Sequence, residues 1–134
     1  MKDEAEKIPF HQSWIGDEEI REVTDTLESG WITTGPRTRA FEEAFAAYHG
    51  AKHAVGVTSC TNALHLSLLA CGVKAGDEVI TTPMTWCSTA NVVEWIGARP
   101  VFVDVHPTRR TIDPQAIEAA ITERTRAIIH VHFA

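Results

Sequence analysis

Short polar side chains follow one another at Thr58–Asn62 (TSCTN), between a β-branched run and a leucine-rich segment. A helix that begins here presents unpaired N–H groups and the positive end of its dipole to an anion. The hydroxyls of Ser59 and Thr61 could complete a phosphate cradle, or one of them could simply cap the helix. Neither GxGxxG nor GxxxxGK[ST] occurs, which favours a smaller phosphorylated cofactor over a dinucleotide or a nucleoside triphosphate.

Trp86 is a second candidate, because it ends the run TPMTW that follows the next β-branched segment. In open α/β sheets, ligands bind beyond the carboxyl ends of the strands. An indole at this edge can stack on a flat heteroaromatic ring, although a lone Trp at a helix start commonly packs in a core.

Other ionisable side chains give no catalytic assignment. Asp104 ends an expected strand, but a role in the following turn is favoured over a catalytic one. His65 is expected to be packed or solvated. None of the lysines has the desolvated surroundings that a Schiff-base lysine requires; they are Lys2, Lys7, Lys52 and Lys74.

Histidine and cysteine spacing predicts no metal centre. His130 and His132 alternate in an apolar run and would share one strand face. Two imidazoles could ligate a metal, but with no third ligand in view structural packing is favoured. Cys60, Cys71 and Cys87 lack C-x-x-C spacing and are expected to stay free in a reducing compartment.

Helices and strands that could position these residues follow from the hydrophobic periodicity. The first 50 residues predict a helical lead-in, with helices over residues 17–29 and from Pro36 to the stop at Gly50. Residues 51–134 alternate between strand and helix, which predicts a mainly parallel sheet covered by helices. The expected strands are His53–Thr58, Glu78–Thr82, Pro100–Val105 and Ala127–Val131; the expected helices are Asn62–Cys71, Ser88–Ile96 and Pro114–Ile121.

Composition narrows the class of protein. The net charge is −6 over 134 residues and there is no basic run, which argues against a nucleic-acid partner. No apolar run approaches the roughly 20 residues that span a bilayer, so no membrane partner and a cytoplasmic location are expected. The sequence stops directly after an apolar strand, and we expect a truncated fold.

Several motifs in order resemble the DegT/StrS family of pyridoxal phosphate (PLP) dependent nucleotide-sugar aminotransferases, which have the fold type I architecture. The motifs, which run from about Ile8 to the end, are WITTGP, TSCTNALHLSLLACG, GDEVITTPMTWCSTANVVEWIGARPVFVDV and IDPQAIEAAITERTRAIIHVHFA. The resemblance implies that residues 1–134 are the N-terminal part of the large, three-layer PLP-binding domain.

The resemblance also implies roles for individual residues. The Ser59-Cys60-Thr61 turn would bind the PLP phosphate, Asn62 would add a backbone N–H, and Trp86 would stack on the pyridine ring. The family often has Gly where this chain has Cys60, so a side chain there narrows the turn. A loop near the substrate and the subunit boundary matches Thr33, Thr34 and Gly35.

The implied activity of the parent enzyme is transfer of an amino group, commonly from glutamate, to a nucleotide-linked keto sugar. The family's Schiff-base lysine and the acid that partners the pyridine nitrogen lie beyond the matched region, so this chain alone is predicted to be inactive. Two alternatives remain: a PLP-dependent sugar dehydratase of the same family, and an inactive chain that acts only as a binding module. The family's usual state implies a homodimer.

Overall fold

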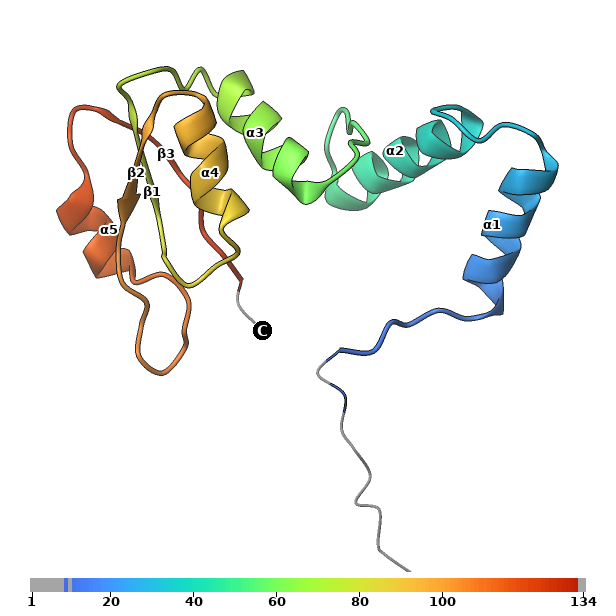
Figure 1. The fold of residues 1–134 in the computed structure, drawn as a ribbon, viewed down its shortest axis with the longest axis horizontal. Helices are drawn as coiled ribbons and strands as arrows, with labels where there is room; N and C mark the ends of the chain where they lie inside the picture. Colours follow the sequence, from blue (N-terminus) through green and yellow to red (C-terminus); the bar gives the residue numbers. More distant parts are fainter. Residues whose placement is uncertain (1–8, 10, 133–134) are drawn as a thin grey trace, which may run out of the picture. The chain divides into compact units, whose positions relative to one another are not determined.

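The computed structural model describes residue 9 and residues 11–132 (Figure 1). The chain divides into two compact units, residues 1–56 and residues 57–134. The first unit is helical and the second is an α/β unit.

The first unit contains the two predicted helices. α1 (Asp17–Glu28) begins at Gly16, whose N–H donates to the Glu19 carboxylate at 2.7 Å. This bond satisfies one of the donors that a helix start leaves free. α2 (Pro36–His49) begins with a proline and ends at Gly50, which has a φ of 62°. Glycine reaches this left-handed conformation without a steric penalty, so it ends the helix.

The second unit is a three-stranded parallel sheet with helices on both faces (Figure 1). The strands, in the order β2-β1-β3, are β1 (Glu78–Thr81), β2 (Arg99–Phe102) and β3 (Thr125–Ile128). The helices are α3 (Cys60–Ala70), α4 (Ser88–Trp95) and α5 (Pro114–Ala120). Residues 51–134 were predicted to alternate between strand and helix, and the structure has this alternation from α3 to β3.

Neighbouring residues of the central strand, β1, point to opposite faces of the sheet and pack in two separate hydrophobic clusters. Val79 packs in one cluster with Leu68 of α3 and with Val92 and Val93 of α4. Ile80 points to the other face, where residues of α5 pack beside it. Both strand residues have no exposed surface. A parallel strand that is covered on both faces is buried along its length, as all four residues of β1 are.

Glu78 is the charged exception in this strand, and its side chain is only 3% exposed. Its carboxylate accepts hydrogen bonds from the Thr122 hydroxyl at 2.6 Å and from Arg124 at 2.6 Å. Arg99 of β2 lies 3.6 Å away. These hydrogen bonds, first from Thr122 and then from Arg124, hold the pKa of Glu78 below its ordinary value. The network joins the starts of all three strands.

One predicted strand, His53–Thr58, does not form. The segment is irregular, and its Val55 side chain is 77% exposed. Within the described residues no strand pairs with this segment, and a strand is stable only where a neighbour takes up its backbone hydrogen bonds. The β-branched residues that suggested a strand are therefore not sufficient here. The prediction of a truncated fold rests partly on Phe133 and Ala134, which lie outside the described residues.

Candidate functional site

The first turn of α3 has the helix start that the sequence predicts. Ser59 is the N-cap, and its hydroxyl oxygen accepts the Asn62 N–H at 3.1 Å. The Asn62 side-chain amide donates to the Thr58 hydroxyl at 2.6 Å. The capping alternative for Ser59 is thus realised, although its hydroxyl proton remains free to donate. The Asn62 N–H is already engaged, so the backbone donor that was expected from Asn62 is occupied by the cap.

Two other donors of this turn are free. Among the described residues, the Cys60 and Thr61 N–H groups and the Thr61 hydroxyl form no hydrogen bond with a protein group, whereas the Asn62 N–H does. Ser59 and Cys60 are exposed and Thr61 is half-buried. Unpaired N–H groups, a hydroxyl and the positive end of a helix are the donor set that a phosphate group requires. The residues present therefore fit a phosphate.

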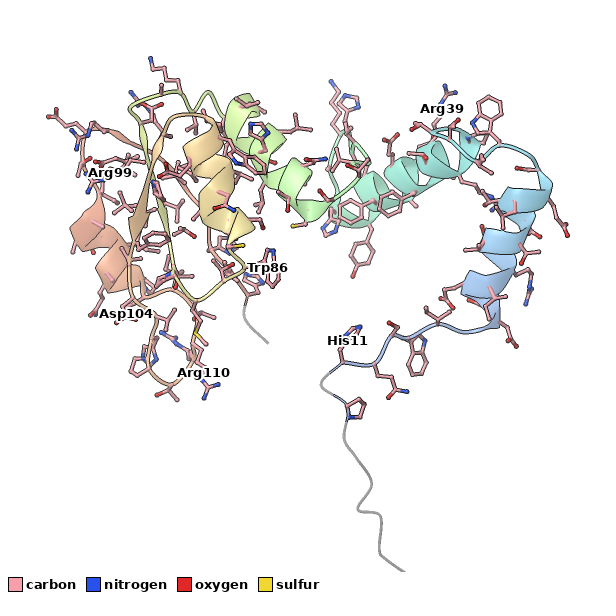
Figure 2. The ribbon with its side chains drawn as sticks, in the orientation of Figure 1. His11, Arg39, Trp86, Arg99, Asp104 and Arg110 are labelled. Carbon is pink, nitrogen blue, oxygen red and sulfur yellow. The ribbon has the colours of Figure 1, made fainter. Side chains whose placement is uncertain are left out.

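Trp86 ends the connection between β1 and α4, and its side chain is 77% exposed (Figure 2). Its main-chain oxygen accepts the Thr89 N–H at 3.0 Å, and the Thr85 and Thr89 hydroxyls are 3.0 Å apart. These contacts fix the backbone at the start of α4 and leave the indole free. The core-packing alternative for Trp86 is wrong in this chain.

α3 and α4 place the turn and the tryptophan at the same end of one helical layer. The two helices pack on the same face of the sheet, and His65 of α3 contacts Trp95 of α4 edge-on, with ring centroids 5.8 Å apart. Figure 1 shows that both helices run in the same direction, so their N-termini lie at the same end. An anion-binding turn and an exposed aromatic ring at one end of a layer can hold a phosphorylated aromatic ligand.

The Thr33–Gly35 loop belongs to the first unit. The Trp31 indole N–H donates to the Thr34 main-chain oxygen at 3.1 Å and lies across Gly35. A Cβ at Gly35 would stand 2.1 Å from the indole nitrogen, so only glycine leaves room for this contact. Thr33 and Thr34 are exposed. Their expected role near the substrate stays a prediction.

Asp104, Lys52 and Lys74 have the surroundings that were expected from the sequence. The Asp104 carboxylate accepts the Val105 N–H at 2.8 Å, and its main-chain oxygen accepts the Asp113 N–H at 3.1 Å, so it organises the turn. Lys52 and Lys74 are exposed. The remaining two, Lys2 and Lys7, lie outside the described residues.

Potential metal ligands in the described part of the chain come together at most in pairs. Residue 9 and residues 11–132 contain no group of three or more potential ligands. The three cysteines are free and exposed. His130 and His132 are stacked but exposed, so the packing role that the sequence favoured for them is wrong. No helix in this part of the chain is long and apolar enough to cross a membrane.

Sequence reasoning missed the Glu78 network and the fit of Trp31 against Gly35. The first had a signal, since a glutamate begins an otherwise uncharged strand and the later run TERTR supplies both threonines and arginines. The second had none, because it depends on the orientation of an indole in a loop.

This arrangement has the fold of the large domain of fold type I, PLP-dependent transferases. Spr1654 of Streptococcus pneumoniae, described as a sugar aminotransferase and solved with pyridoxamine phosphate (PMP), is 43% identical with a TM-score of 0.83. The match covers 92% of this chain and 31% of that one. 3-Amino-5-hydroxybenzoic acid synthase is 40% identical with a TM-score of 0.83, over 96% and 34% of the two chains.

The chain belongs to the DegT/DnrJ/EryC1/StrS aminotransferase family, whose model matches residues 13–134. The spore coat polysaccharide biosynthesis protein SpsC of Bacillus subtilis is 55% identical over 126 residues, which are 94% of this chain and 32% of SpsC. The uncharacterized protein MJ1066 of Methanocaldococcus jannaschii is 54% identical over 127 residues, which are 95% of this chain and 33% of MJ1066. The chain therefore spans about a third of the length of these relatives.

Proposed function

We propose that this chain is the cofactor-holding N-terminal part of a PLP-dependent enzyme that transfers an amino group to a nucleotide-linked keto sugar. The observation that carries the proposal is the start of α3, where the Cys60 and Thr61 N–H groups and the Thr61 hydroxyl are free to bind a phosphate. Membership of the family supports PLP as the cofactor, since solved relatives hold PLP or PMP.

Each residue of the turn would have a separate task. Thr61 would donate its N–H and its hydroxyl to the phosphate, and Cys60 would add a second N–H. Ser59 would hold the turn in shape through Asn62 while donating its own hydroxyl proton. Trp86 would cover one face of the pyridine ring and exclude water from it.

When bound, PLP acts as an electron sink for the substrate's amino group, and the protein supplies binding and orientation. The chemistry also needs a lysine to bond the cofactor and an acid beside the pyridine nitrogen. We assign neither within residues 1–134, and the parent enzyme would supply them from sequence beyond this region. Glutamate would be the amino donor, and the parent enzyme would work as a homodimer.

A PLP titration of the purified chain, followed by borohydride reduction and peptide mass mapping, tests this proposal. We expect saturable binding that inorganic phosphate competes away, with no lysine covalently trapped. Absence of binding would refute the holding role. Trapping at one lysine would instead refute the claim that the reactive lysine lies elsewhere.

Replacement of Trp86 by Ala tests the stacking role. Loss of an aromatic stack worth about 0.5–1.5 kcal/mol should weaken PLP binding roughly two- to tenfold. Trp14 is similarly exposed and lies in the other unit, so Trp14→Ala is the matched control. Unchanged PLP affinity in the Trp86 variant would remove that residue from the site.

A further inference from the structure

Two histidines form an exposed, stacked pair directly beyond β3. The ring centroids of His130 and His132 are 4.9 Å apart and the ring planes are inclined by 24°. The preceding residue, Ile129, still donates its N–H to the Ile80 oxygen at 2.8 Å, so the backbone is held up to the start of the pair. Alternate residues of an extended segment share a face, which explains why the two rings meet.

We propose that His130 and His132 together bind one divalent transition-metal ion, with Cu²⁺ bound more tightly than Zn²⁺ or Ni²⁺. Imidazole nitrogen suits these three ions, and at a given nitrogen site Cu²⁺ has the highest affinity. Mg²⁺ and Ca²⁺ prefer oxygen ligands and are excluded by the same chemistry. Water completes the coordination, since the described residues place no third ligand beside the pair.

The two rings are close enough to chelate one ion after they rotate out of the stack. Two nitrogens bound to one ion at about 2.0–2.1 Å lie roughly 2.9 Å apart at the right angle that Cu²⁺ favours, and roughly 3.3 Å apart at the tetrahedral angle of Zn²⁺. The rings, with centroids 4.9 Å apart, reach either separation when each turns its nitrogen edge toward the other. Both side chains are exposed, and neither ring is hydrogen-bonded to a protein group in the described part of the chain. The rotation therefore breaks no contact other than the stack.

Other histidines of the chain are arranged differently. The Nδ1 atom of His106 accepts the Thr108 N–H at 3.3 Å, which ties that ring to its own turn. The ring of His65 contacts Trp95. His53 is exposed and has no second imidazole within contact distance among the described residues, so it is the matched control for a lone surface histidine.

The test is isothermal titration calorimetry of the protein without a polyhistidine tag. Cu²⁺ and Zn²⁺ are titrated in separate experiments, and Mg²⁺ is the reference ion. We expect one Cu²⁺ per chain and no Mg²⁺ binding. His130→Gln and His132→Gln should each weaken Cu²⁺ binding by at least about tenfold, as loss of a metal contact does, while His53→Gln leaves it unchanged. No binding, or equal loss in all three variants, would overturn the proposal.

Electron paramagnetic resonance of the Cu²⁺-loaded unaltered protein gives a second test that depends on no variant. The spectrum should show coupling to two imidazole nitrogens. A spectrum without nitrogen coupling, or with a single nitrogen, would also overturn the proposal. Neither test uses PLP, so failure here leaves the proposed cofactor site untouched.

Discussion

Replacement of Thr61 by Val separates ligand binding from stability at the start of α3. Valine keeps the shape of threonine and removes only the hydroxyl, which has no protein partner in the described residues. A hydrogen bond to a charged group contributes about 1.5–3 kcal/mol. PLP affinity should therefore fall by roughly 10- to 150-fold, while the free energy of unfolding without PLP changes by no more than about 0.5 kcal/mol, because the lost hydroxyl has no protein partner.

Ser59→Ala is the matched comparison, because its hydroxyl caps the helix through the Asn62 N–H. Loss of an N-cap costs about 0.5–2 kcal/mol, so this variant should lower both PLP affinity and the melting temperature. The assay is fluorescence titration with PLP beside thermal denaturation followed by circular dichroism. The reasoning is wrong if Thr61→Val binds PLP as tightly as the unaltered chain, or if it destabilises the free chain as much as Ser59→Ala does.

Three further predictions concern the folded framework. Ile80→Val removes one methyl group from a fully buried site and should cost about 0.5–1.5 kcal/mol in urea denaturation, whereas Ile121→Val, at a site 55% exposed, should be nearly neutral. Because the folded-state pKa of Glu78 is lowered, its carboxylate stabilises the fold at neutral pH, and this contribution is lost as pH falls through that pKa. In Glu78→Gln, the free energy of unfolding should therefore depend less on pH on the acid side. The same pH dependence in the variant and the unaltered chain would contradict the network. Gly35→Ala should displace the Trp31 indole, whose nitrogen would stand 2.1 Å from the new Cβ, and a tryptophan emission spectrum identical to that of the parent chain would count against this contact.

Local chemistry made much of this fold predictable. Pro36 and Gly50 define the bounds of α2, and Asp113 followed by Pro114 defines the start of α5, because each restricts the backbone by itself. The strand predicted at Glu78–Thr82 from its β-branched run also forms, as β1. These signals act within a few residues and do not depend on the rest of the chain.

The failures arose where the outcome depends on distant partners. His53–Thr58 has the composition of a strand, but pairing requires a neighbour that composition does not reveal. The exposure of Trp86 and of the histidine pair was likewise undecided by residue type, since both kinds of side chain occur buried and exposed. At the candidate site, the sequence offered both a phosphate cradle and a helix cap, but it did not decide which hydroxyl caps the helix; the structure gives this role to Ser59.

Helix α3 is anchored unevenly along its length. Its Leu68 is buried in the core and Leu64 packs beside it, whereas Ser59 and Cys60 at its start are exposed and follow the unpaired segment 53–58. The first turn can therefore fray without disturbing the core, with a free energy of opening well below that of global unfolding. A ligand that needs this turn formed binds with an apparent dissociation constant equal to the intrinsic one divided by the fraction of chains in which it is formed. Amide hydrogen exchange at Asn62 and Ala63, whose N–H groups are bonded to Ser59, thus measures how often the first turn opens. A bound phosphate should slow exchange at these two amides and at Cys60 and Thr61, whose N–H groups it would engage directly.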